Sequence, residues 1–261
     1  MSIFDLTHRP PADVLFKRGD ANDVRWGETV RVVPAEYATA SVVLLGLPQD
    51  EGVRRNKGRV GAAAAPDAIR SCFYRTVALE TPLLFDLGNT RLDNLPDLES
   101  MHARHQAVVQ QVLADGKTLI VLGGGNDTSY PDVAALAQAV GQSPLAFNVD
   151  AHFDVRADSP RNSGTPYRQV LEEGHLLGSQ FFEVAYQPFA NSLTYQRYLA
   201  EKGVAAIALE AVLAQGIAAT FAPLLAATPA AAVFWGLDMD VVSASAAPGV
   251  SAPNATGLSG Q

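Results

Sequence analysis

The chain has 261 residues, of which 48% are apolar and 18% are charged, and this mixture predicts a globular protein rather than a disordered one. The 19 Lys and Arg against 27 Asp and Glu give a net charge of −8, which disfavours binding to the negative backbone of nucleic acids. The single cysteine, Cys72, excludes an intrachain disulfide and a zinc site built from cysteines. No apolar stretch reaches the roughly 20 residues of a membrane span, and charges interrupt the N-terminal segment, so we expect a soluble, cytoplasmic protein.

Short apolar runs alternate with longer helical stretches from residue 41 onward. Residues 1–40 show no sustained periodicity, and we expect an N-terminal arm there, followed by one domain over residues 41–261. The pattern predicts strands at 42–45, 83–85, 118–122, 145–149 and 231–237, and helices at 66–75, 98–114, 132–139, 191–201 and 210–227. The strands are apolar throughout, as in sheets covered on both faces, which indicates a three-layer α/β/α fold with a mostly parallel central sheet.

Polar side chains follow three of these strands. The strand at 118–122 precedes a glycine-rich loop with Asn126, and the strand at 231–237 precedes Asp238 and Asp240. The strand at 145–149 precedes a D-x-H-x-D segment, which consists of Asp150, His152 and Asp154. The carboxyl ends of parallel strands meet at one edge of a sheet, where ligands bind, so we expect these side chains to lie close together.

The chemistry of this set points to a divalent cation. In an extended chain the D-x-H-x-D spacing places all three side chains on one side. Four carboxylates that meet at one place repel one another unless cations lie among them, and oxygen ligands with one imidazole suit Mn²⁺ or Mg²⁺. One such segment alone is equally typical of a turn or helix cap, but the second segment favours a site for two metal ions. The glycine-rich loop lacks the Lys-Ser/Thr pair of a phosphate-binding P-loop.

These motifs, in this order, resemble the ureohydrolase superfamily of arginases, agmatinases and formimidoylglutamases. Further matches are Gly46-x-Pro48 near the start of the domain and Pro248-Gly249 with Ala252-Pro253 near its end. The segments EGVRRN at 51–56 and SGTPY at 163–167 are more similar to the formimidoylglutamase branch than to arginase. The resemblance implies an arginase-like fold and the hydrolysis of N-formimidoyl-L-glutamate to L-glutamate and formamide, a step of histidine degradation.

The resemblance also implies the roles of the individual ligands in a centre of two manganese ions. Two divalent ions lower the pKa of a bridging water, which then attacks the amidine carbon. Asp150 and Asp154 are the implied catalytic residues, and Asp154 would carry the proton to the leaving amine. Asp150 and Asp238 would bridge the ions, with His152 and Asp240 completing one and Asp154 and Asn126 the other.

Position 126 departs from the superfamily, which usually has histidine there. The neutral amide of Asn126 is a weaker ligand, so we expect one of the two ions to bind less tightly. Its neighbours Asp127, Ser129 and Tyr130 are expected to orient other residues rather than to bind metal.

Four residues are candidates for substrate binding: Arg156, Ser163, Asn162 and Arg55. Arg156 lies just beyond the metal segment, where a guanidinium would bind a substrate carboxylate through two hydrogen bonds, although a surface ion pair with Asp158 is the alternative. Arg54, Arg55 or Arg59 would supply a second positive charge, unless they form a solvated loop.

Two alternative functions remain open on the sequence alone. One is hydrolysis of a guanidino compound such as arginine or agmatine, which would release urea. The other is an inactive, metal-poor binding protein, suggested by Asn126 and by the end of the chain at residue 261, where the superfamily usually continues with another strand and helices. The resemblance implies a homotrimer or homohexamer, and we expect His102 and His105 to face solvent.

Overall fold

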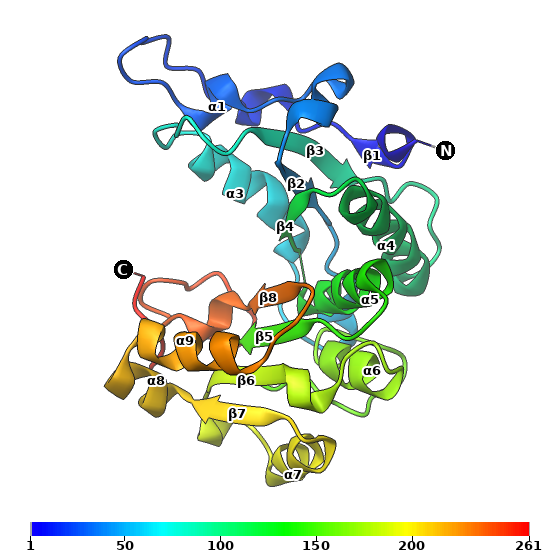
Figure 1. Cartoon of the computed structure of the whole chain (residues 1–261), viewed down its shortest axis with the longest axis vertical. Helices are drawn as coiled ribbons and strands as arrows, with labels where there is room; N and C mark the ends of the chain where they lie inside the picture. Colours follow the sequence, from blue (N-terminus) through cyan, green and yellow to red (C-terminus); the bar gives the residue numbers. More distant parts are fainter. Residues whose placement is uncertain (1, 261) are drawn as a thin grey trace. The chain divides into compact units, whose positions relative to one another are not determined.

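The computed structural model describes residues 2–260, which form two compact units (Figure 1). Unit 1 comprises residues 2–51 and 60–131, and unit 2 comprises residues 52–59 and 132–260. Each unit has its own four-stranded sheet with parallel pairing between most of its strands. The predicted α/β class and the mostly parallel pairing are therefore confirmed, whereas the division into an arm and one catalytic domain stays a prediction.

The sheet of unit 1 has the strand order β1-β3-β2-β4. β1 pairs antiparallel with β3, and β2 pairs in parallel with β3 and β4. The segment 2–40 thus contributes one short strand to this sheet. The strands are β1 (Thr7–His8), β2 (Val42–Gly46), β3 (Leu84–Thr90) and β4 (Thr118–Leu122), and the first helices of the chain are α1 (Trp26–Thr29), α2 (Glu51–Arg55), α3 (Ala65–Phe73), α4 (Leu98–Ala114) and α5 (Ser129–Val140).

The sheet of unit 2 is parallel throughout, with the order β7-β6-β5-β8 that Figure 1 shows. Phe147 lies at the centre of its core, stacked on Phe182 at 5.4 Å and on Trp235 at 4.5 Å between ring centroids. The strands are β5 (Leu145–Val149), β6 (Phe181–Tyr186), β7 (Ala205–Ala208) and β8 (Val233–Leu237), and the helices are α6 (Pro166–Glu172), α7 (Leu193–Lys202), α8 (Leu209–Gln215) and α9 (Ile217–Ala227).

The predicted elements are present, with one helix divided. Gly216 has φ +85° and separates α8 from α9 where the sequence predicts one helix over 210–227. Among the described residues no single helix has the length and hydropathy needed to cross a membrane, and α8 and α9, bent by 102°, meet that test only as a pair. The sequence analysis missed β6 and β7, because β6 contains a buried glutamate and β7 is a short alanine-rich run.

A buried ion pair joins α3 to β3 in unit 1. The Arg70 guanidinium is fully buried and donates to both carboxylate oxygens of Asp86, at 2.8 and 3.0 Å. The Tyr74 hydroxyl donates to the same carboxylate, and burial together with the charge of Asp86 raises the pKa of Tyr74. The pair satisfies charges that would otherwise be costly in the core.

Replacing Arg70 by methionine should lower the free energy of unfolding by about 3–5 kcal/mol, because it leaves the Asp86 carboxylate buried without its counter-charge. Urea denaturation measures the loss. Arg18→Met is the matched control, since Arg18 forms an exposed ion pair with Asp23 at 2.8 Å and should contribute less than about 1 kcal/mol. Equal losses in both variants would contradict a stabilising role for the buried pair.

Candidate metal centre

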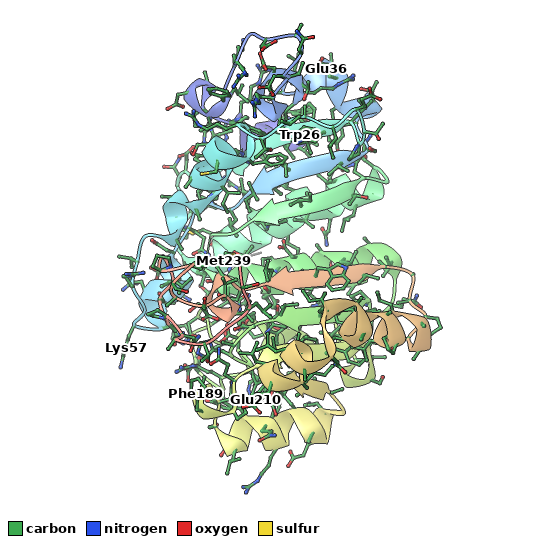
Figure 2. All side chains as sticks on the ribbon, turned by 90° about the vertical axis from the view of Figure 1, so that its left-hand side faces the viewer. Trp26, Glu36, Lys57, Phe189, Glu210 and Met239 are labelled. Atoms are coloured by element: carbon green, nitrogen blue, oxygen red, sulfur yellow. The ribbon has the colours of Figure 1, made fainter. Side chains whose placement is uncertain are left out.

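Two neighbouring strands of unit 2 end in aspartates. β5 and β8 pair in parallel with Val149 opposite Leu237, so Asp150 and Asp238 follow at adjacent strand ends. The Asp238 amide donates to the Val149 carbonyl at 3.1 Å, which extends the pairing to the first aspartate. Met239, which separates Asp238 from the next aspartate, marks this end of β8 in Figure 2.

Both strand ends form the same turn. The Asp150 Oδ1 accepts from the His152 amide at 2.7 Å, and the Asp238 Oδ1 accepts from the Asp240 amide at 2.9 Å. In each of these aspartate turns, the residue two positions after the aspartate points its side chain back towards the aspartate carboxylate. The extended conformation predicted for the D-x-H-x-D segment is therefore wrong, and Asp154 has φ +45°, a left-handed conformation that aspartate tolerates.

Five of the six predicted metal ligands come together in two overlapping groups. One consists of Asp150, His152 and Asp240, and the other of Asp150, Asp154 and Asp238. Within each group the potential ligand atoms lie within 4.8 Å of one another, and Asp150 belongs to both. This arrangement provides two adjacent positions for a cation that share one carboxylate.

The cluster carries an excess of negative charge in the absence of a cation. Burial, then the charge of Asp238, raises the pKa of Asp150 well above its ordinary value. Burial, then the charge of Asp240, raises the pKa of Asp238 to about 7. The Nδ1 of His152 lies 3.0 Å from Asp240 Oδ2 and 3.6 Å from Asp150 Oδ1, and its hydrogen bonds to Asp150 and Asp240 raise its pKa to about 11. All three pKa shifts show that additional positive charge would stabilise this cluster.

The donor set fits divalent manganese or magnesium. Asp240 Oδ1 is buried and has no hydrogen-bond partner among the described residues, which is costly unless a cation contacts it. Carboxylates with one imidazole are the hard ligands that these ions prefer.

Two residues that the sequence analysis missed hold the metal segment in place. Asn191 Oδ1 accepts from the Phe153 amide at 2.9 Å, and its Nδ2 donates to the Ala151 carbonyl at 2.8 Å. The Gln187 amide donates to the same carbonyl at 3.0 Å. Both residues follow β6. The sequence signal that could have identified them is a pair of side-chain amides on either side of a Pro-Phe-Ala turn, directly after an apolar run.

The glycine-rich loop of unit 1 contains Asn126, in the short helix Asn126–Thr128, and Ser129 Oγ donates to Asn126 Oδ1 at 2.9 Å. Ser129 thus orients a neighbour, as expected. A Cβ at Gly124 would lie 2.2 Å from the Leu47 carbonyl oxygen, so only glycine fits there. The role of Asn126 as a metal ligand stays a prediction.

The solvent-facing positions predicted for two histidines are wrong. His102 and His105 are buried in unit 1, with exposed fractions of 1% and 0%. His102 Nε2 lies 2.8 Å from Asp127 Oδ2, which also accepts from Gln49, and His105 Nδ1 lies 2.7 Å from Thr90 Oγ1. Burial is tolerated because each ring has a polar partner, and Asp127 has the orienting role that the sequence predicted.

The predicted substrate-binding residues of unit 2 belong to α2 and to the loop before α6, which contact each other. The Ser163 amide donates to the Gly52 carbonyl at 3.1 Å, and Asn56 Nδ2 donates to Ser163 Oγ at 3.0 Å. Arg55 donates to the Arg161 carbonyl at 3.1 Å. Arg59 donates to the carbonyls of residues 248 and 250, at 2.9 and 2.7 Å, and so holds the loop after β8.

Arg156 is an exposed cation of this group. Its amide donates to the Gly164 carbonyl at 2.8 Å, and a Cβ at Gly164 would lie 2.7 Å from Arg156 Cδ, so the arginine side chain lies directly over the glycine. Among the described residues Arg156 forms no ion pair, and Asp158 accepts from Asn162 at 3.1 Å instead. Asn162 Oδ1 also accepts from the Gly164 amide at 2.9 Å, so Asn162 holds the loop that supports the arginine.

Comparison with known proteins identifies relatives over most of the chain. Residues 40–261 match the model of the arginase family. A formimidoylglutamase of Rhodococcus jostii is 35% identical over 254 residues, which cover 91% of this chain and 76% of the relative. The crystal structure of Trypanosoma cruzi formiminoglutamase with Mn²⁺ matches with a TM-score of 0.83 and 32% identity, over 91% of this chain and 82% of that one. The Bacillus subtilis formimidoylglutamase structure matches with a TM-score of 0.84 and 25% identity, over 94% and 79%.

The raised pKa of Asp238 predicts a pH-dependent stability of the metal-free protein. Between the ordinary aspartate pKa near 4 and the folded value of about 7, the folded state binds more protons than the unfolded state, so stability falls as pH rises. In EDTA, wild type and Asp238→Asn should melt nearly alike at about pH 3.5, below the ordinary aspartate pKa, and the variant should melt about 3 °C or more higher at pH 8. A calorimetric scan measures both, and a variant that melts lower than wild type at pH 8 would contradict repulsion at this position.

Proposed function

Because the chain belongs to the arginase family, we propose that it is a binuclear-manganese hydrolase that converts N-formimidoyl-L-glutamate and water to L-glutamate and formamide. The observation that carries this proposal is the pair of overlapping ligand groups that share Asp150 at the ends of β5 and β8. Several relatives are named formimidoylglutamases and are about one third identical to this chain. Their name supports this substrate class over the others of the family. The place of the reaction in histidine degradation follows from that substrate.

The ligand assignment combines the geometry of unit 2 with the family pattern. Asp150 and Asp238 would bridge the two ions, and their neighbouring strand ends support that role. His152 and Asp240 would complete one ion, since they form one ligand group with Asp150. Asp154, grouped with Asp150 and Asp238, would complete the other together with Asn126. When bound, the two ions would lower the pKa of a water and so supply the nucleophile for C–N cleavage.

Asp154 is the residue proposed to move the proton. Its carboxylate belongs to the ligand group with Asp150 and Asp238, which supports a role beside the water that the two ions would activate. A carboxylate there accepts a proton from the attacking water and delivers it to the leaving amine. Asp150 contributes as the carboxylate common to both cation positions.

Arg156 is the residue proposed to bind a substrate carboxylate. It is exposed, it has no ion-pair partner among the described residues, and it follows the metal segment by two positions. A guanidinium binds a carboxylate through two parallel hydrogen bonds, which suits a substrate derived from glutamate. Ser163, Asn162 and Arg55 would shape and line the loop beside it.

A product assay tests the proposed function. We expect the protein purified with Mn²⁺ to release formamide and glutamate from N-formimidoyl-L-glutamate, and to bind about two manganese ions per chain. Release of urea from arginine or agmatine without formamide would assign it to guanidino hydrolysis instead. Binding of less than one ion per chain at saturating Mn²⁺, with no product, would identify a metal-poor binding protein.

The same assay tests the carboxylate contact. Arg156→Met should lower kcat/KM for N-formimidoyl-L-glutamate by roughly 30-fold or more, mainly through KM, because it removes a charge-assisted hydrogen-bond pair. Arg197→Met, which removes an exposed arginine of α7, is the control and should leave kcat/KM unchanged. An equal effect of the two substitutions would refute the contact.

A histidine at position 126 should strengthen the weaker metal position. The imidazole is a better ligand than the carboxamide, so Asn126→His should lower the Kd of the weaker Mn²⁺ by roughly tenfold or more. Isothermal titration calorimetry on metal-stripped protein measures it. Ser129→Ala, which removes the hydroxyl that donates to Asn126, is the comparison variant, and an unchanged Kd in Asn126→His would show that residue 126 does not bind the ion.

We also propose a cytoplasmic location and assembly into a homotrimer or homohexamer. Both rest on the family resemblance and on the small-molecule substrate.

A further inference from the structure

Two buried polar residues interrupt the apolar strands behind the metal centre. Asn148 on β5 lies opposite Glu183 on β6 in the parallel pairing, and both have an exposed fraction of 0%. Their neighbours along the strands are apolar. A carboxyl group and an amide are costly to bury, so their presence here requires a structural or functional reason.

The two side chains form a hydrogen-bonded chain that ends on the carboxylate shared by both ligand groups. Asn148 Nδ2 donates to Glu183 Oε2 at 2.9 Å and to Asp150 Oδ2 at 3.3 Å. The other oxygen of Asp150, Oδ1, accepts from the His152 amide at 2.7 Å. Both oxygens of Asp150 are therefore held, one by the backbone and one by the Asn148 amide.

The orientation of the Asn148 amide is set by the hydrogen bonds that its Nδ2 donates, because its oxygen accepts none from residues 2–260. Asn148 Oδ1 and Glu183 Oε1 are buried and have no hydrogen-bond partner among the described residues. Rotating the amide by 180° would turn its oxygen towards two carboxyl groups. Gly236 lies opposite Asn148 on β8, and a Cβ there would lie 2.5 Å from the Tyr167 hydroxyl, so the tyrosine occupies the space over this glycine.

We propose that Glu183 is a positioning residue of the metal centre, which acts through Asn148 to hold the Asp150 carboxylate in its bridging orientation. This inference rests on the proposed function, in which Asp150 binds both ions. With Asp150 engaged by cations, Glu183 Oε2 at 2.9 Å would be the nearer of the two remaining acceptors of the Asn148 amide, the other being the His152 carbonyl at 3.5 Å. The acceptor oxygen of residue 183, rather than its charge, is the property that matters.

Three variants and a double-mutant cycle test this role by the Mn²⁺ affinity of the metal-stripped full chain, measured by calorimetry. Glu183→Met removes the acceptor at similar volume and should raise the Kd for Mn²⁺ about tenfold or more. Glu183→Gln keeps an acceptor oxygen and should stay within about threefold of wild type. In an Asn148→Ala background, which should itself raise the Kd, Glu183→Met should have no further effect, because the connection to Asp150 is already cut.

Thr220→Val is the matched control for lost buried polarity. Thr220 is 3% exposed on α9 and donates to the Gly216 carbonyl at 2.9 Å, so its loss should lower stability and leave the Kd unchanged. Equal Kd increases in Glu183→Gln and Glu183→Met, or additive effects in the cycle, would overturn the positioning role. If Glu183→Met does not fold, the comparison of Asn148→Ala with Glu183→Gln decides, and an unchanged Kd in Asn148→Ala refutes the proposal. Wild-type protein that binds no Mn²⁺ would instead overturn the proposed function.

Discussion

Mutual repulsion among carboxylates is the constraint on which the rest of unit 2 depends. Asp150 and Asp238 end two adjacent strands, and Asp154 and Asp240 are turned towards them. The turns at 150–152 and 238–240 are each closed by a backbone amide, so the carboxylates cannot separate without breaking those hydrogen bonds. His152 supplies one compensating charge, and the unpartnered oxygen of Asp240 shows that this is not enough. Divalent cations are the charges that complete the balance.

The surroundings of the cluster hold it rigidly. Asn191 and Gln187 hold the backbone of the 150–154 segment from outside, and Asn148 contacts Asp150 from within the sheet. Groups that do not touch a metal but fix its ligands set how tightly it binds. The need to fix the metal ligands explains the polar residues buried in β5 and β6, because aliphatic side chains would stabilise the apolar core more at these positions.

Substrate choice depends on a different part of the same unit. A centre of two cations polarises any amidine carbon, whether formimino or guanidino, so the metal ligands by themselves do not select the substrate. The loop at 162–165 does, in our proposal, because Gly164 leaves room for the Arg156 side chain and Asn162 fixes that loop. A charged group beyond the reacting carbon is then recognised by a cation that has no other partner among the described residues.

Most of the strands and helices were predictable from the sequence, although β6 and β7 were not, and so was the gathering of four aspartates and one histidine at the ends of β5 and β8. Continuous apolar runs mark buried strands, and the aspartates that follow β5 and β8 must lie near one another when those strands pair. Two features were not predictable. The left-handed backbone of Asp154 and the burial of His102 depend on backbone torsions or on partners distant in the sequence that no local pattern encodes.

Sequence alone therefore determined which chemical groups are available and at which strand ends they lie. Tertiary structure decided which of them share a carboxylate, which oxygens lack a partner and which buried amide holds the shared one. The physical reason is that residue type and spacing fix local chemistry, whereas distances of about 3 Å between Asn148, Glu183 and Asp150 arise only when β5 and β6 pair in one particular register.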